Sequence, residues 1–106
     1  DVRLVAVVPF RGQEERFSPA DRVRFLRAVS AADEVEVLAG GYRRGCYAVR
    51  NDFLVDRAAL VVAWYDGSPG GTRYTLRRAL ARGREVWNLH PSGGGLAIRP
   101  VQPALF

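Results

Sequence analysis

A chain of 106 residues, with 48% hydrophobic and 25% charged residues, is large enough for one hydrophobic core and too short for two. No apolar run approaches the roughly 18 to 20 residues that cross a bilayer, and we expect no signal peptide because a strand-like stretch begins at Val2. Cys46 is the sole cysteine, which excludes an internal disulfide and two-cysteine metal sites. These properties favour a soluble cytoplasmic protein without a membrane partner.

The basic residues are all arginines, and they give the chain a net charge of +5. They are scattered along the sequence, and adjacent pairs occur only at 43–44 and 77–78. This distribution favours a solvated arginine-rich surface over a nucleic-acid partner. Affinity for polyanions that rests on charge alone fades as salt is raised.

The first half of the chain predicts strand, helix and strand. Residues 2–8 are apolar apart from Arg3, which is typical of a strand buried on both faces. Ser18 followed by Pro19 predicts a helix start, with Asp21 placed as in a capping box. That helix ends near Ala32 and presents one apolar side: Val23, Phe25, Leu26 and Val29. The alternation over 34–38 predicts a second strand nearer an edge.

The second half repeats this alternation after a loop over 39–45. We expect a helix over 46–57 with an inner arc of Cys46, Val49, Phe53 and Leu54. A strand over 60–65, a helix over 72–82 and a strand over 85–89 follow. The segment from Pro91 onward is rich in Pro and Gly, and its apolar residues are expected to pack back or to join an interface: Leu96, Ile98, Val101, Leu105 and Phe106.

Strands that alternate with helices predict an α/β fold, a Rossmann-like three-layer sandwich. Its mainly parallel sheet has about four strands, with helices on both faces. The domain covers 1–91, and 92–106 forms a tail. Ligands of such sheets bind beyond the carboxyl ends of the strands, where this chain has turns. Two of these turns place Pro9, Phe10 and His90 on the expected rim.

The turn over 66–72 is the clearest candidate site. A continuously apolar strand ends in Asp66, and the sequence then runs Gly67, Ser68, Pro69, Gly70, Gly71 and Thr72 into an amphipathic helix. Bare backbone N–H groups and a helix N-terminus bind phosphate readily. Gly70 and Gly71 would let the backbone approach a phosphate, to which Thr72 would donate from its N–H and hydroxyl. The alternative is a tight turn in which Thr72 is the helix N-cap. Asp66 would accept a ribose hydroxyl, although Asp before Gly is also common turn chemistry.

Other side chains have two interpretations each. Arg50 falls on the inner arc of its helix and needs a bound anion or a carboxylate, unless it reaches the helix edge. Trp64, Tyr65 and Tyr74 would stack on a base or belong to the core. His90 is the sole histidine, so no multi-histidine metal site is available, and we expect it to cap the last strand.

A family resemblance rests on several of these motifs. The stretch 50–56 (RNDFLVD), the strand ending in Tyr65 and Asp66, and the Gly70-Gly71-Thr72 turn with Ala79 in its helix resemble the YpsA-like branch of the SLOG superfamily. Residues 8–10 (VPF) with Gln13 and Glu14 fit the same branch. The resemblance covers about residues 2–91.

The resemblance implies a Rossmannoid domain that binds a small phosphorylated, nucleotide-like ligand, with Asn51 supporting the rim. Family members begin with two further strands. Because this chain starts at Asp1 and contains no Met, we expect the first third of the family fold to be absent. Its loss would expose Val5, Val7 and Val62, and a homo-oligomer is one way to cover them.

Three functions therefore remain open. The favoured one is a nucleotide-binding or sensing module with no catalytic residue, metal or identified cofactor. The second is a nucleoside-monophosphate phosphoribohydrolase of the LOG type, but those relatives carry glutamates after their Gly-Thr, and here Arg73, Tyr74 and Thr75 follow. The third is DprA-like binding of single-stranded DNA, against which the absence of a concentrated basic or aromatic platform argues.

Overall fold

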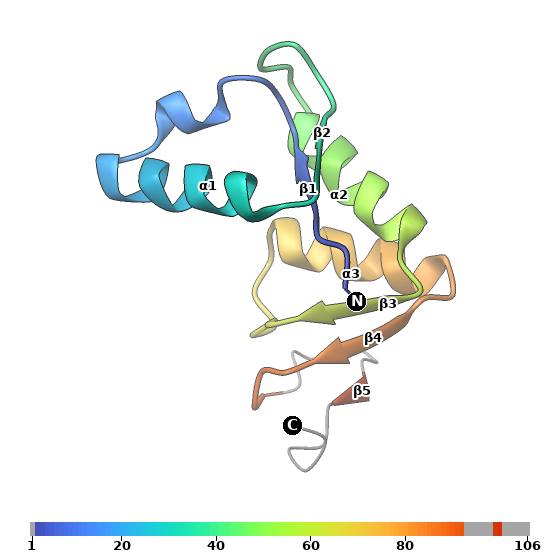
Figure 1. Ribbon diagram of the computed structural model, residues 1–106. Helices are drawn as coiled ribbons and strands as arrows, with labels where there is room; N and C mark the ends of the chain where they lie inside the picture. The colour runs from blue at the N-terminus through green and yellow to red at the C-terminus, as the bar shows by residue number, and fades with distance from the viewer. Residues whose placement is uncertain (1, 93–98, 101–106) are drawn as a thin grey trace. The chain divides into compact units, whose positions relative to one another are not determined.

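The computed structural model describes residues 2–92 and 99–100 as an α/β protein (Figure 1). The chain divides into two compact units, Asp1–Arg50 and Asn51–Phe106. All of its strand pairs are parallel, and they form two sheets, β1-β2 and β3-β4-β5. The prediction of parallel strands that alternate with helices is confirmed. The four expected strands are divided between these two sheets.

The first unit is a βαβ segment. Strand β1 (Val5–Val8) leads through a short 3-10 helix (Gln13–Arg16) to helix α1 (Pro19–Ala31), and β2 (Glu34–Val37) follows. The strands pair in register from Val5 opposite Glu34 to Val8 opposite Val37. Val2 to Leu4 precede the strand that was expected to begin at Val2. Val5 is exposed, so the expectation of a strand buried on both faces is wrong. Two strands offer too little surface to bury both of their faces.

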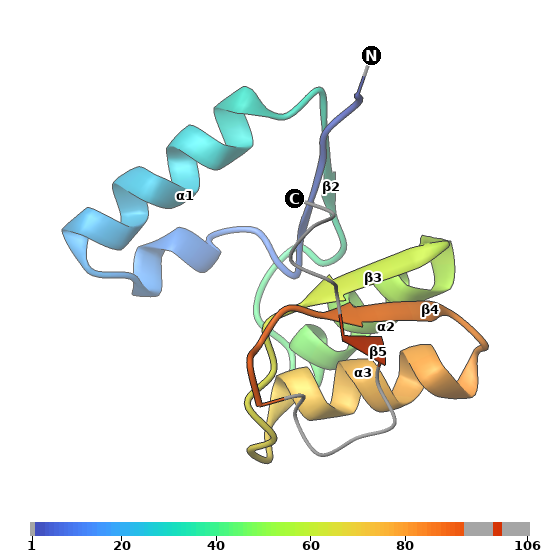
Figure 2. The same ribbon diagram turned by 90° about the horizontal axis from the view of Figure 1, so that it is seen from below.

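Helix α1 begins as its sequence predicts, but its apolar side is not buried. The Ser18 hydroxyl accepts a hydrogen bond from the Asp21 N–H at 3.3 Å, and Pro19 is the first helical residue. Val23 and Leu26 are nevertheless each 47% exposed. Figures 1 and 2 show α1 extending to one side of the β1-β2 pair, beside the 3-10 helix. The predicted core side of α1 is therefore only partly covered, since Phe25 and Val29 are half-buried.

Helix α2 (Cys46–Arg57) has the predicted bounds and leads into the second unit. There β3 (Leu60–Ala63), α3 (Gly71–Ala81) and β4 (Glu85–Asn88) form another βαβ segment, and β5 (Arg99–Pro100) pairs with β4. Leu60 lies opposite Glu85, and Ala63 lies opposite Asn88. Strand β5 falls within the segment expected to be a tail, whose apolar residues lie outside the described ranges: Leu96, Ile98, Val101, Leu105 and Phe106.

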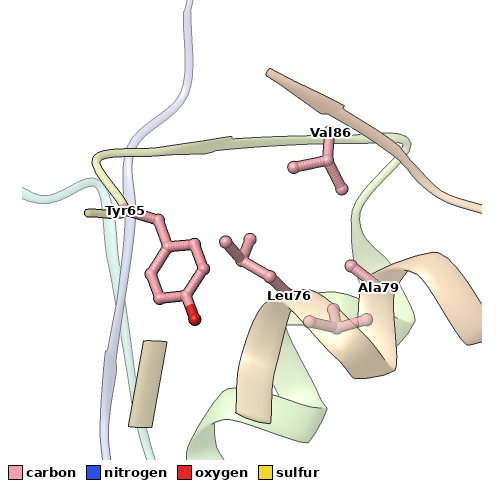
Figure 3. Close-up of a cluster of buried hydrophobic side chains, with 5 residues drawn as sticks. Tyr65, Leu76, Ala79 and Val86 are labelled. Carbon is pink, nitrogen blue, oxygen red and sulfur yellow. The ribbon is translucent and has the colours of Figure 1, made fainter. Parts of the chain in front are cut away.

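The core of the second unit joins one residue of α2 to α3, β4 and the segment after β3 (Figure 3). It consists of Val55, Tyr65, Leu76, Ala79 and Val86, and Val61 and Ala63 pack against it. On α2 the buried residues are Cys46 and Val55, whereas Val49 and Leu54 of the predicted inner arc are exposed. That part of the prediction is wrong because the packing partners of α2 select a face displaced from the one its apolar residues suggest. None of the helices in the described ranges has the length and apolar character of a membrane span.

Candidate functional site

The candidate site lies in the second unit, where β3 and β4 end side by side. The Leu89 N–H donates to the Ala63 carbonyl at 2.8 Å, which continues the pairing one step past the strands. The chain leaves β3 through residues 64–70 and leaves β4 through Leu89 and His90. Because parallel strands end at the same edge, the segment from Trp64 to Thr72 and His90 belong to one rim.

The buried side chain of Asn88 joins the two chain segments of this rim through hydrogen bonds. This side chain is 1% exposed. The Asn88 amide oxygen accepts hydrogen bonds from the Tyr65 N–H at 2.9 Å and the His90 N–H at 3.2 Å. Its amide nitrogen donates to the Tyr65 carbonyl at 3.0 Å. A buried amide with its partners satisfied fixes the backbone on both sides of the rim.

Asp66 and Ser68 form a compact turn directly after β3. The Asp66 Oδ1 accepts hydrogen bonds from the Ser68 hydroxyl at 2.6 Å and the Ser68 N–H at 2.9 Å. The Ser68 hydroxyl bond, followed by the backbone N–H bond, lowers the pKa of the Asp66 carboxyl, and His90 adds an electrostatic contribution. Asp66 is exposed and therefore remains an ionised acceptor, while Gly67 takes the φ of 98° that this turn needs.

The turn into α3 leaves several donors open. Gly70 is the N-cap with φ 140°, and no side chain caps the helix. The Tyr74 N–H makes the first helical bond, to the Gly70 carbonyl at 3.1 Å. Within the described ranges, the amides of Gly71, Thr72 and Arg73 have no acceptor. The first turn of an α-helix leaves such N–H groups for a ligand or water.

Two further donors belong to the same part of the chain. The Arg73 Nε is buried and has no hydrogen-bond partner among the described residues. His90 accepts a hydrogen bond from the Ser92 N–H at 3.1 Å on Nδ1 and lies 2.8 Å from the Ser92 hydroxyl. Because Nδ1 accepts, the neutral ring carries its proton on Nε2. His90 thus offers an N–H donor.

Trp64 is the exposed aromatic residue of the rim. It is 66% exposed, and its ring packs against His90 at a centroid distance of 4.8 Å. The other two aromatic residues considered for base stacking have different places. Tyr65 is buried in the core, and the Tyr74 hydroxyl donates to Asp52. Of the three, the rim therefore exposes Trp64.

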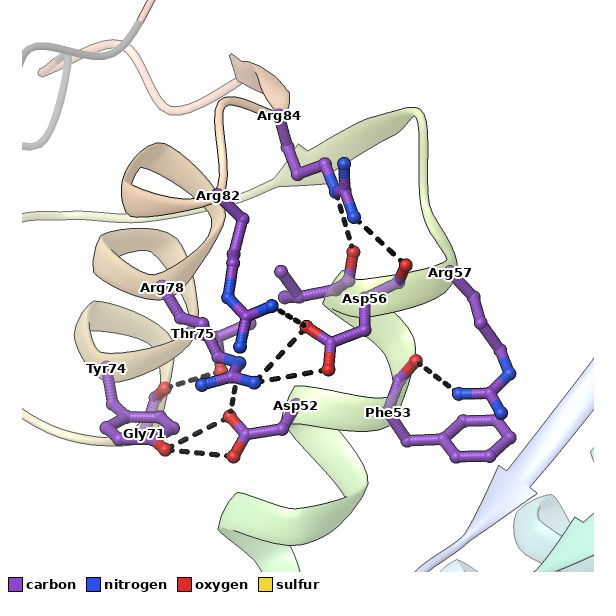
Figure 4. Close-up of polar contacts among 11 residues, drawn as sticks. Asp52, Phe53, Asp56, Arg57, Gly71, Tyr74, Thr75, Arg78, Arg82 and Arg84 are labelled. Carbon is purple, nitrogen blue, oxygen red and sulfur yellow. Dashed lines mark hydrogen bonds and ion pairs between the residues drawn. The ribbon is translucent and has the colours of Figure 1, made fainter.

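The ionic contacts between α2 and α3 were missed by the sequence analysis (Figure 4). The Arg78 Nε lies 3.1 Å from Asp52, and the Arg78 Nη2 lies 3.1 Å from Asp56. The Tyr74 hydroxyl donates to Asp52 at 3.0 Å, which raises the pKa of the phenol. Hydrogen bonding from Arg78 lowers the pKa of Asp56, and the pKa of Arg78 is raised in turn. These contacts fix α3 against α2, and with it the end of the glycine-rich turn.

The other predicted site residues come from segments of the chain that do not form this rim. Pro9 and Phe10 are buried in the first unit. The Arg50 guanidinium lies 5.9 Å from the centre of the Tyr47 ring, also in the first unit. Asn51 is half-buried at the start of the second unit. The second unit therefore brings together Asp66, Gly67, Ser68, Gly70, Gly71, Thr72 and His90. Asn88 was missed because its role depends on a partner strand.

Comparison with known proteins gives one informative similarity. No protein-family model matches the chain. The chain is 28% identical over 104 residues to YoqJ, an uncharacterized SPbeta prophage-derived protein of Bacillus subtilis (strain 168). The match covers 85% of the chain and 61% of YoqJ. The chain thus spans about three fifths of the length of this relative.

Proposed function

We propose that the chain is a nucleotide-binding or nucleotide-sensing module, with the ligand on the rim where β3 and β4 end. The observation that carries the proposal is the set of unpaired amides of Gly71, Thr72 and Arg73 at the start of α3. They offer a phosphate several hydrogen bonds together with the positive end of the helix dipole. The buried, unpartnered Arg73 Nε adds a charged donor to the same segment.

The neighbouring side chains suit the rest of a nucleotide. The ionised Asp66 carboxylate would repel a phosphate but accepts hydrogen bonds from ribose hydroxyls. Trp64 is 66% exposed and offers its ring to a base, and the T-shaped contact with the His90 ring holds it in place. Phosphate, sugar and base thus each have a suitable partner in the segment 64–73. The full fold we propose is the Rossmann-like three-layer sandwich of the YpsA-like branch of the SLOG superfamily.

The sequence after the turn favours binding over catalysis. Thr72 is followed by Arg73, Tyr74 and Thr75, and Tyr74 is held by Asp52. A phosphoribohydrolase needs a carboxylate near the glycosidic bond, and this first turn of α3 supplies none. Incubation with AMP, followed by chromatography for free adenine, tests this part of the proposal. Release of the base at a rate proportional to the protein concentration would contradict a purely binding role.

A thermal-shift assay with AMP, ADP, ATP and inorganic phosphate tests the binding itself. A ligand at ten times its Kd stabilises the folded state by about 1.4 kcal/mol. For a chain of this size we expect a rise in Tm of about 5 to 10 °C. Trp64→Ala should weaken the response to nucleotides and leave the response to inorganic phosphate unchanged.

Gly71→Asp is the matched test of the phosphate contact. A Cβ built at Gly71 meets no atom within 4 Å, and a carboxylate in the first turn stabilises a helix. The variant should therefore fold at least as well as wild type but repel a phosphate. Gly71→Asn, which has the same shape without the charge, should retain most of the response. Equal nucleotide stabilisation of wild type and Gly71→Asp would refute the proposed site.

A further inference from the structure

The first unit exposes two tyrosines among arginines where β1 and β2 end. Tyr42 is 51% exposed and Tyr47 is 40% exposed. Arg43 and Arg44 lie between them in sequence, and Arg50 follows one helical turn after Tyr47. Arg16 of the 3-10 helix joins them, because its guanidinium lies 4.5 Å from the centre of the Tyr42 ring. We call these six residues the tyrosine–arginine surface: Arg16, Tyr42, Arg43, Arg44, Tyr47 and Arg50.

The two exposed rings are held in place by a buried one. Phe10 is 2% exposed. It packs edge-on against Tyr42 at a centroid distance of 5.5 Å and against Tyr47 at 6.0 Å. The Arg11 N–H donates to the Ala39 carbonyl at 2.9 Å, which ties the loop after β1 to the loop after β2. Rings fixed in this way lose little further entropy when a partner stacks on them.

The surface is positively charged without local compensation in its own loop. Residues 39–50 contain three arginines and no acidic residue. Arg43 and Arg44 are exposed and make no ion pair within the described part of the chain. Exposed, unpaired arginines beside half-exposed aromatic rings contribute little to folding. They have the chemistry that binds a flexible polyanion carrying aromatic groups.

We infer that the tyrosine–arginine surface binds single-stranded nucleic acid. No concentrated basic or aromatic platform is visible in the sequence, because this surface is assembled from the 3-10 helix, the loop after β2 and the start of α2. Unpaired bases stack on the parts of the Tyr42 and Tyr47 rings that Arg16 and Phe10 leave exposed, and the guanidinium groups of Arg43 and Arg44 contact phosphates of the same strand. A duplex hides its base faces in the helical stack and offers such rings nothing to bind. The inference rests on residues of the first unit, whereas the proposed nucleotide site rests on residues of the second.

Fluorescence anisotropy with labelled single-stranded DNA and RNA oligonucleotides of mixed sequence tests the stacking contact. Tyr42→Ala should raise the Kd about tenfold, the scale of one base–aromatic contact. Tyr42→Phe keeps the ring face and its edge contact with Phe10, and should stay within about twofold of wild type. Equal affinities of the two variants would overturn the inference. So would equal affinity for a duplex of the same sequence.

A second pair of variants tests the contact between Arg43 and the phosphates. This pair keeps the inference testable if Tyr42→Ala fails to fold. Arg43→Gln should reduce the slope of log Kd against log salt by about 0.7, the value for one phosphate contact with a single strand. Arg27→Gln removes the same charge from the exposed side of α1 and should leave the slope unchanged. Identical slopes for these two variants would show general attraction of a basic protein and overturn the inference. Nucleotide stabilisation that is lost in Gly71→Asp but retained in Arg43→Gln separates the two proposals.

Discussion

Removing the Asn88 amide should destabilise the rim of the second unit more than any exposed substitution nearby. Asn88→Ala leaves the Tyr65 N–H, the Tyr65 carbonyl and the His90 N–H without their present partner. A buried polar group that loses its hydrogen bond costs about 1–3 kcal/mol. Because a small cavity admits water to some of these groups, we expect a loss of about 2–4 kcal/mol in the free energy of unfolding.

Asn88→Asp distinguishes lost hydrogen bonds from lost volume. The introduced carboxyl has the shape of the amide, but when ionised it faces the Tyr65 carbonyl with an acceptor instead of a donor. When protonated, it donates to that carbonyl as the amide does. Burial raises the pKa of the carboxyl above its unfolded value. The deficit of this variant relative to wild type should therefore be largest near pH 7 and shrink as the pH falls through the raised pKa.

Urea denaturation followed by tryptophan fluorescence measures both effects, because Trp64 and Trp87 flank this edge. Leu89→Ala is the matched control. It shortens an exposed side chain next to Asn88 and retains the bond from the Leu89 N–H to Ala63. A loss below about 0.5 kcal/mol for Asn88→Ala would refute this account of the rim, since surface changes fall in that range. A deficit of Asn88→Asp that does not depend on pH would refute the assignment of the donor.

Two further substitutions test the packing of α3. Leu76→Ala should lower the free energy of unfolding by about 3 kcal/mol, because the side chain is fully buried in the core of the second unit; a loss below about 1 kcal/mol in urea denaturation would contradict a closed core there. Asp56→Asn should remove part of the stability that wild type has above pH 5. The hydrogen bond from Arg78 lowers the pKa of Asp56 below its ordinary value of 3.8, so that stability is present above 3.8 and is lost as the pH falls through the lower, folded-state pKa. Melting curves from pH 7 to 2.5 should converge for wild type and variant at the acid end, and parallel curves would contradict the ion pair.

The start of α1 and the bounds of α2 could be predicted because their signals are local. Ser18 and Pro19 define the start of α1 through one hydroxyl and one missing N–H. The α2 range of 46–57 follows from the loop glycines before it and the change of period after it. The buried faces could not be predicted in the same way. Val49 and Leu54 are apolar but exposed, and Val55 is buried, because the partners of α2 decide which face is covered.

The backbone conformation of the candidate site could be predicted from the sequence, whereas the side chain that stabilises it, Asn88, could not. Gly67 and Gly70 do adopt positive φ, as a turn rich in glycine suggests. Asn88 gave no signal of its own, because its two partner residues are 23 and two positions away and one of them belongs to the segment after another strand. A polar residue at the end of a strand is a sign to look for, since a buried side chain there needs hydrogen-bond partners from the segments that follow the neighbouring strands.

The contacts between α2 and α3 did have a readable pattern. Asp52 and Asp56 are four residues apart on α2, and Arg78 of α3 is followed four residues later by Arg82, the C-cap of that helix. Residues at this spacing share one face of a helix, so two rows of opposite charge identify the faces that meet.

That pairing has a consequence for the glycine-rich turn. Tyr74, which donates to Asp52, lies three residues after Gly71, and the Thr75 hydroxyl donates to the Gly71 carbonyl at 2.9 Å. The first turn of α3 is thus fixed by side chains that leave its open N–H groups unused. The contacts that fix this helix start do not use its open N–H groups, so these donors stay oriented and unoccupied. A preorganised anion site requires this arrangement.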